Sequence, residues 1–212
     1  MGLRLEEKVP RLSAIDFNVA ATDGSVTSLL LPAGVTSLEG LLFPDTYQVS
    51  NSETAKQGVE RMVRLTERVA EQEDLVAGSG RFGLSPYQVL IVASIIEREA
   101  RVDEDRAKIA RVIYNRLYLG MPLQIDATLY YQQDGSRPFS ELLALDTPYN
   151  TYTRTGLPPT PINSPGEAAM EAALNPPDGD WLYYVTVNPD TGATIVVKAG
   201  RTAAGAKAAR SH

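Results

Sequence analysis

The stretch "SPYQVLIVASIIEREA", residues 85–100, decides the fold of this chain. Its first residues are a strong helix-start signal: Ser85 can cap the helix, Pro86 suits the first helical position, and Gln88 completes a capping box. An apolar run, "VLIVASII", follows, and its one polar side chain is a serine. Because a helix that is apolar on nearly all sides belongs in an interior, we expect this helix to be the central element of the core.

Two glutamates, Glu97 and Glu99, end this helix. On a helical wheel Glu97 lies over the small residues Ala93 and Ser94, which leave space for a ligand, whereas Glu99 lies over two isoleucines. A carboxyl group held against apolar surface loses part of the solvation of its charged form, which favours a general-acid role. Arg101, at i+4, could instead pair with Glu97. The plainer interpretation is the solvated end of a helix, and spacing alone leaves both open.

Composition excludes several kinds of chemistry. The chain has 212 residues, a net charge of −6 and no cysteine, which excludes disulfides, thiolate nucleophiles and Cys-based zinc sites. An acidic chain without a dense Lys/Arg stripe is a poor candidate for nucleic-acid binding, so we expect no nucleic-acid partner. The one histidine, His212, lies in a terminal "RSH" that resembles a cloning remnant, so a Ser-His-Asp hydrolase is excluded.

A metal site made only of carboxylates is conceivable, but nothing in the spacing of the acids supports it, so we expect no metal and no cofactor. The acids considered are Glu97, Glu99, Asp103 and Asp126.

Turn signals and periodicity predict an α+β fold with central buried helices, short antiparallel strands and a C-terminal β-hairpin. We expect residues 1–12 to be a linker or remnant of an N-terminal region, 13–200 to be the main domain, and 201–212 to be a tail with a tag remnant. The longest apolar stretches are far short of the ~20 residues that span a bilayer, and no signal peptide is visible. The terminal "MG" and "RSH" resemble cloning remnants, so we expect the chain to be a piece of a longer protein.

Caps, breakers and hydrophobic periods predict the individual elements. The first helix, which starts at Ser13, is expected to bury Ile15, Phe17 and Val19. A second start signal at Ser164 is expected to open a late helix. The expected helices cover residues 13–23, 53–73, 85–100, 103–119 and 164–174; residues 122–132 are expected to be extended, 147–167 to form a long loop, and 181–187 with 194–198 to form the hairpin.

The long loop and the extended piece gather side chains that suit a sugar. Amides and hydroxyls bond to sugar hydroxyl and acetamido groups, and aromatic rings stack on flat sugar faces. The alternative is an ordinary ordered loop whose tyrosines pack in the core. The candidate sugar-binding residues are Gln124, Asp126, Tyr149, Asn150, Thr151 and Tyr152.

Several of these motifs, taken in order, resemble one family. The chain is similar to the catalytic domain of the MltG (YceG-like) endolytic murein transglycosylases, and the resemblance runs from about Leu38 to Thr186. The matching stretches are "LEGLLFPDTY", "ASIIEREA", "VIYNRLYLGMPLQIDATLYY", "PYNTYTRTGLPPTPINSPGEAAMEAALNP" and "LYYVT".

The resemblance implies a bacterial cell-wall enzyme that cuts between N-acetylmuramic acid and N-acetylglucosamine within glycan strands, leaves 1,6-anhydro ends and terminates strand elongation. Its catalytic glutamate corresponds to Glu97, with Ser94 and Glu99 as supporting residues and the six sugar-binding candidates in its cleft. It also implies glycan strands and the cell-wall synthesis machinery as partners. Family members carry a single membrane-spanning helix that places the catalytic domain outside the cytoplasm, and a LysM-like subdomain. Neither is visible here, and the segment after the hairpin lacks the expected aromatic residue and histidine.

Two alternatives remain open. A hydrolytic muramidase would use Glu97 as acid and Asp126 as its second carboxylate. A non-catalytic module would only bind glycan. Under the transglycosylase hypothesis, we expect Glu97 to face the polar loop around Asn150.

Overall fold

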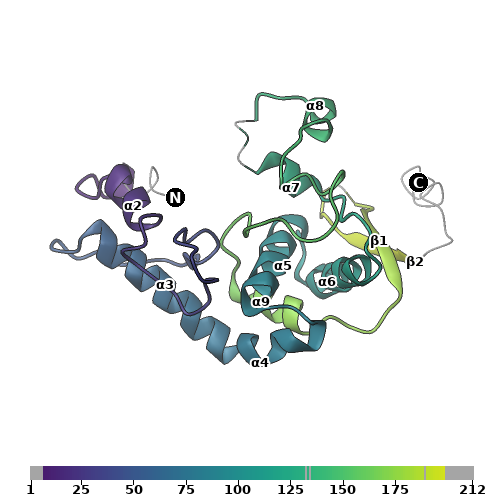
Figure 1. Cartoon of the computed structure of the whole chain (residues 1–212), viewed down its shortest axis with the longest axis horizontal. Helices are drawn as coiled ribbons and strands as arrows, with labels where there is room; N and C mark the ends of the chain where they lie inside the picture. The colour runs from purple at the N-terminus through teal and green to yellow at the C-terminus, as the bar shows by residue number, and fades with distance from the viewer. Residues whose placement is uncertain (1–6, 132, 134, 189, 199–212) are drawn as a thin grey trace.

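Helix α5, Pro86–Glu99, forms the centre of the molecule, and α9 (Glu167–Leu174) and α6 (Asp103–Tyr118) pack against it (Figure 1). The computed structural model describes residues 7–198 except 132, 134 and 189. The expected tail therefore lies outside the described residues, as does the first half of the expected N-terminal remnant.

The capping box predicted for α5 is confirmed. The Ser85 hydroxyl accepts a hydrogen bond from the Gln88 N–H at 3.2 Å, and the Gln88 side chain accepts one from the Ser85 N–H at 2.9 Å. Every residue from Val89 to Ile96 is buried. The helix ends because Ala100 adopts extended backbone angles. Burial on all sides makes α5 a rigid support for the residues at its end.

The other elements surround α5 in three groups. In the first group, helix α2 packs on α3, and the short α4 connects α3 to the underside of α5 and α9 (Figure 1). In the second, α6 packs against the β-hairpin on the side that faces away from α5. In the third, α7 and α8 lie above α5. The bounds are α2 Ala14–Ala20, α3 Ala55–Gln72, α4 Leu75–Ser79, the 3-10 turn η1 Gly80–Phe82, α7 Asp126–Tyr130, α8 Phe139–Leu143, β1 Trp181–Thr186 and β2 Thr194–Lys198.

Strands β1 and β2 pair antiparallel, with Val185 opposite Ile195. Helix α6 fixes the hairpin at two points: the Arg116 Nε donates to the Leu182 carbonyl at 2.7 Å, and the Asp105 carboxylate accepts from the Thr194 N–H at 2.6 Å. Among the described residues, helices occur with one small antiparallel sheet, which confirms the α+β prediction.

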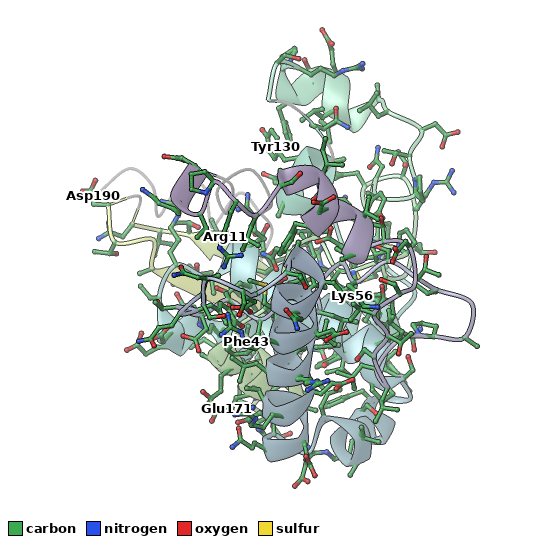
Figure 2. The ribbon with its side chains drawn as sticks, turned by 90° about the vertical axis from the view of Figure 1, so that its left-hand side faces the viewer. Arg11, Phe43, Lys56, Tyr130, Glu171 and Asp190 are labelled. Atoms are coloured by element: carbon green, nitrogen blue, oxygen red, sulfur yellow. The ribbon has the colours of Figure 1, made fainter. Side chains whose placement is uncertain are left out.

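The α2–α3 side of the molecule is anchored by long-range bonds. The guanidinium of Arg11 bonds to the carbonyls of Ser50 and Glu53, just before α3, and the Phe43 N–H donates to the Met62 carbonyl at 3.5 Å. Figure 2 looks onto this side, with Arg11 and Phe43 beside α3. Within the part of the chain that the structure describes, no helix has both the length and the apolar character that crossing a membrane requires.

Three local predictions were wrong. Helix α2 buries Phe17 as expected, but Ile15 is 73% and Val19 is 50% exposed, since the buried face follows Ala14, Phe17 and Ala20 at i, i+3 and i+6. With only seven residues, α2 gives too few turns for the apolar pattern to identify its buried face.

The expected extended piece at 122–132 contains a helical turn, α7, which begins at Asp126. The prediction that a helix starts at Ser164 was also wrong. Helix α9 begins at Glu167, its N-cap is Gly166, and no side chain caps it by a hydrogen bond.

Candidate active site

Glu97 lies at the last turn of α5, and its side chain is 32% exposed. Its Oε2 accepts a hydrogen bond from the Gly166 N–H at 3.3 Å and lies 3.6 Å from Nη1 of Arg106 on α6. Gly166 is the N-cap of α9, so the carboxylate meets the end of that helix where partial positive charge collects. Two positive groups from two different helices therefore converge on one carboxyl group.

Ser94 binds the segment that precedes α9 to helix α5. It lies one turn before Glu97; its hydroxyl donates to the Ile91 carbonyl at 2.7 Å and accepts from the Ile162 N–H at 3.0 Å. The segment that follows Ile162 is thereby bound along α5, and four residues later it places Gly166 over Glu97. Ser94, which the helical wheel placed beside Glu97, therefore holds the loop that leads from Ile162 to Gly166.

A third segment reaches the same point. A β-carbon built on Gly166 would lie 3.7 Å from Oε2 of Glu97 and 4.0 Å from Cγ of Pro44. Pro44 belongs to the "LEGLLFPDTY" motif, so this motif reaches the start of α9, where Gly166 bonds to Glu97.

Glu99 meets a different environment. Its carboxyl group accepts hydrogen bonds from the Tyr184 hydroxyl of β1 at 3.1 Å and from the Ala127 N–H of α7 at 3.4 Å. Burial raises the pKa of Glu99, and the negative charge of Asp126 raises it further, against the lowering effect of the two hydrogen bonds. Glu99 therefore joins α5 to α7 and β1.

Three sugar-binding candidates gather on the Glu99 side. The Tyr152 hydroxyl donates to the exposed carboxylate of Asp126, and burial, followed by this bond, raises the pKa of Tyr152. Gln124 has an exposed side chain and a left-handed backbone with φ +51°, stabilised by a 2.9 Å bond from its N–H to the Thr151 carbonyl. Such backbone strain in a non-glycine residue concentrates at functional sites.

Asn150 does not face Glu97, which corrects the expectation. It is fully buried, its Nδ2 donates to the carbonyls of Leu143 and Leu145, and its Oδ1 accepts from the N–H groups of Tyr152 and Thr153. These four bonds use both the donor and the acceptor groups of the amide. Asn150 therefore shapes the loop that carries Tyr152.

Thr151 and Tyr149 are also interior residues. Thr151 is 2% exposed, accepts from the Ile125 N–H at 3.0 Å and pairs with the Thr128 hydroxyl at 2.9 Å. Tyr149 is 8% exposed and its hydroxyl pairs with that of Thr160 at 2.8 Å. The ordered-loop alternative therefore describes these two residues and Asn150, whereas Tyr152 shares the open side with Gln124 and Asp126.

Sequence reasoning missed Arg106, Gly166 and Glu39. Arg106 pairs with Glu97, whereas Arg101 had been considered as a possible partner at i+4. The side chain of Arg101 packs where a β-carbon of Gly192 would lie, 2.4 Å away. Glu39 is half-buried and bonded to the Tyr131 hydroxyl, and burial raises its pKa. Its signal was available, since Glu39 stands among apolar residues in the quoted motif "LEGLLFPDTY".

The described residues contain no group of three or more His, Cys, Asp or Glu side chains placed to hold a metal ion.

These features define a helical α+β domain with two half-buried glutamates at the end of its central helix. The profile of the YceG-like family matches residues 2–198, and the chain belongs to this family.

Relatives with names agree with that membership. The chain is 40% identical over 151 residues to a protein of Bacillus subtilis (strain 168) named endolytic murein transglycosylase, covering 70% of this chain and 41% of the relative. It is 36% identical over 155 residues to a protein of the same name from Streptococcus pneumoniae serotype 2, covering 70% of this chain and 28% of the relative. The chain thus spans well under half the length of these relatives.

A crystal structure of a YceG-like protein from Listeria monocytogenes superposes with a TM-score of 0.78 at 32% identity, covering 94% of this chain and 69% of that one.

Proposed function

We propose that this chain is the catalytic part of an endolytic murein transglycosylase, which cleaves the bond between N-acetylmuramic acid and N-acetylglucosamine inside peptidoglycan strands. Family membership supports the proposal, as do two relatives of that name at 40% and 36% identity. The observation that carries it is the placement of Glu97: a partly exposed carboxyl group on a rigid helix end, bonded to a helix N-terminus and beside a guanidinium.

In the first step, protonated Glu97 gives its proton to the glycosidic oxygen as the bond to the anomeric carbon breaks. The leaving sugar keeps that oxygen as a hydroxyl, and positive charge develops at the anomeric centre. Glu97 is now a carboxylate, and the Gly166 N–H and the Arg106 guanidinium stabilise its new charge.

In the second step, the Glu97 carboxylate accepts the proton of the muramyl C6 hydroxyl while that oxygen attacks the anomeric carbon of the same sugar. The product is a 1,6-anhydro ring, and Glu97 regains its starting protonation. No water is consumed, so no second base is needed. The attacking hydroxyl is part of the same sugar, which gives it a high effective concentration.

We infer that Gln124, Asp126 and Tyr152 bind substrate on the open side of the loop, and that Asn150, Thr151 and Tyr149 position that loop from inside. Support comes from the exposed side chains of Gln124 and Asp126, the Tyr152–Asp126 bond, and the four bonds of the buried Asn150 amide.

Product analysis tests the proposal. The purified chain is incubated with peptidoglycan sacculi, and the released fragments are separated and weighed. Anhydro ends, lighter by one water than hydrolytic products, are expected from the wild type, and Glu97→Gln should release almost none. Reducing ends would support a muramidase, and a fully active Glu97→Gln protein would remove Glu97 from the mechanism. Glu71→Gln, an exposed change on α3, is the matched control and should retain activity.

We also infer that the full-length protein is membrane-anchored, with this domain outside the cytoplasm and in contact with the cell-wall synthesis machinery. The substrate supports this location, since peptidoglycan lies outside the cytoplasmic membrane. Protease accessibility of the domain in intact protoplasts would test the location, and crosslinking followed by mass spectrometry would test the partners.

A further inference from the structure

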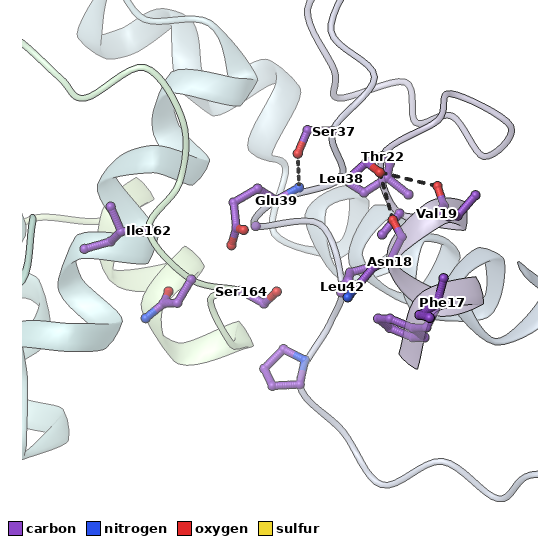
Figure 3. A pocket seen from close by; sticks show the side chains of 15 residues that line it. Phe17, Asn18, Val19, Thr22, Ser37, Leu38, Glu39, Leu42, Ile162 and Ser164 are labelled. Carbon is purple, nitrogen blue, oxygen red and sulfur yellow. Dashed lines mark hydrogen bonds between the residues drawn. The ribbon is translucent and has the colours of Figure 1, made fainter. Parts of the chain in front are cut away.

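A groove of about 730 Å³ lies between α2, the segment 37–44 and the segment 162–164 (Figure 3). Its volume is in the range of pockets that bind small ligands, roughly 300–1,000 Å³. Neither the family resemblance nor the residues predicted to form the site assign it a role.

The chemistry of the lining is mixed and nearly uncharged. Among the described residues that line the groove, Glu39 is the only one with an ionisable side chain. Amides and hydroxyls alternate with apolar side chains, and the apolar Ile15 and Val19 of α2 are 73% and 50% exposed there. The polar lining residues are Asn18, Thr22, Ser37, Asn163 and Ser164.

The side chain of Glu39 faces this groove. Figure 3 shows its carboxyl group directed into the space between Ile162 and Ser164 on one side and α2 on the other. Its backbone N–H donates to the Ser37 hydroxyl at 3.4 Å, and its carboxyl group interacts with the Tyr131 hydroxyl. The interaction with Tyr131 favours one orientation of the carboxyl group, which reduces the conformational entropy lost when Glu39 binds a ligand.

The two walls of the groove are in direct contact beside Glu39. Gly40 has φ +82°, and a β-carbon built on it would lie 2.3 Å from Cβ of Pro161. Only glycine allows both this backbone and this approach. The distance between the two walls is therefore fixed at this point.

Both walls approach the end of α5. The segment 37–44 ends at Pro44, which lies beside Gly166, and the segment that begins at Ile162 continues to Gly166, whose N–H bonds to Glu97. A linear ligand that lies along the groove is therefore led toward the carboxyl group at the end of α5.

We propose that this groove binds N-acetylhexosamine units of the glycan strand on one side of the bond that Glu97 cleaves, with Glu39 accepting hydrogen bonds from their acetamido N–H or hydroxyl groups. This inference rests on the proposed function. The exposed Ile15 and Val19 supply apolar surface for the sugar rings, and the amides and hydroxyls of the lining pair with their polar groups. A stem peptide fits less well, because its carboxylates would meet Glu39 and find no Lys or Arg in the lining.

The test measures binding without turnover. The full chain carrying Glu97→Gln is titrated with the hexamer of N-acetylglucosamine by calorimetry, with and without a second substitution. Glu39→Ala should weaken binding about tenfold or more, since it removes charged hydrogen bonds. Glu39→Gln retains an acceptor for Tyr131 and should weaken binding less. Asn18→Trp, at an exposed position of α2, should weaken it at least as much as Glu39→Ala by filling the groove, and Glu71→Gln should not change it.

Circular dichroism and thermal unfolding confirm that each variant folds. No hexamer binding, or binding unchanged by both Glu39→Ala and Asn18→Trp, would overturn the proposal. Peptide-free glycan strands should bind as well as intact ones; binding of intact strands alone would assign the groove to stem peptides and overturn it too. Failure of the proposed function would look different: Glu97→Gln would still cleave sacculi, whatever the groove variants do in the binding assay.

Discussion

Glu97 and Glu99 leave the same helix two residues apart and enter opposite environments. Glu97 is partly open and meets a helix N-terminus and a guanidinium. Glu99 is more enclosed, bonded to Tyr184 and Ala127, and has a raised pKa. A raised pKa is often taken as the mark of a catalytic acid. Here Glu99, the acid with the raised pKa, connects α5, α7 and β1. The acid beside the start of α9 is Glu97.

The strongest test of this difference between Glu97 and Glu99 is to replace each glutamate by glutamine. Glu97→Gln should lower the rate of glycan cleavage by about 10²–10⁴-fold, the usual contribution of general acid–base catalysis. Glu99→Gln retains groups that can bond to Tyr184 and Ala127 and should lower the rate less than about tenfold. The measurement is the initial rate of anhydro-muropeptide release. Equal losses, or the reverse order, would exchange the roles of the two acids.

The loop on the Glu99 side can be tested through its buried amide. Asn150→Ala leaves two partly buried carbonyls and two N–H groups without their partner, so the free energy of unfolding should fall by about 2–3 kcal/mol. Urea denaturation measures the change. Asn51→Ala, at an exposed turn, is the control and should shift stability by less than about 0.5 kcal/mol. A similarly small effect of Asn150→Ala would mean that the loop does not depend on this residue.

On the Glu97 side, Arg106→Met keeps most of the side-chain stem and removes the charge. Turnover should fall about tenfold, since one charge-assisted contact to the carboxylate is lost, and KM should change little, because the guanidinium acts through Glu97 and does not touch the sugar. Steady-state kinetics on soluble glycan strands separates the two constants. Arg68→Met on the exposed side of α3 is the matched control. A rise in KM with unchanged turnover would make Arg106 a substrate-binding residue.

The smallest expected effect is a pH dependence of stability that comes from Glu99. Its pKa is raised on folding, so the folded protein binds this proton more tightly than the unfolded chain does. The stability it contributes is fully present below the unfolded value of 4.5 and is lost as pH rises through the folded pKa. Relative to Glu99→Gln, the wild type should therefore lose stability between about pH 4 and pH 7. Urea unfolding at both pH values checks this, and a parallel change in the two proteins would contradict it.

Local signals in the sequence were sufficient for the elements that carry the site. The Ser85–Gln88 capping box depends on groups three residues apart, and the hairpin depends on one turn, so both could be predicted without knowledge of the fold. The helical wheel also placed Ser94 and Glu97 on one face correctly, and the segment from Ile162 to Gly166 packs along that face.

Contacts that close over long sequence distances could not be predicted. The Gly166 N–H lies 69 residues from Glu97 in sequence, and the start signal at Ser164 gave no sign that the helix would begin later and present this N–H to a carboxylate. Arg106 was missed for a related reason. The chain breaks sharply at Ala100, and α6 then turns back toward the end of α5, which places Arg106 beside Glu97.

Residue type alone could not separate ligand contacts from interior bonds. An asparagine in a polar loop has the same sequence signature whether its amide meets a sugar or four backbone groups, and for Asn150 the fold decided for the backbone. The reverse held for α2, where apolar Ile15 and Val19 were assigned to the core and instead line the groove.

The contact between Gly40 and Pro161 has a consequence for how such proteins can diverge. A β-carbon at position 40 would overlap the proline ring, and the left-handed backbone there already disfavours other residues. A change at either position alone would therefore alter the groove width or strain the chain, so the two positions should be inherited as a pair. Groove width, and with it the choice of ligand, would then evolve by coupled steps at two sites 121 residues apart rather than by drift at one.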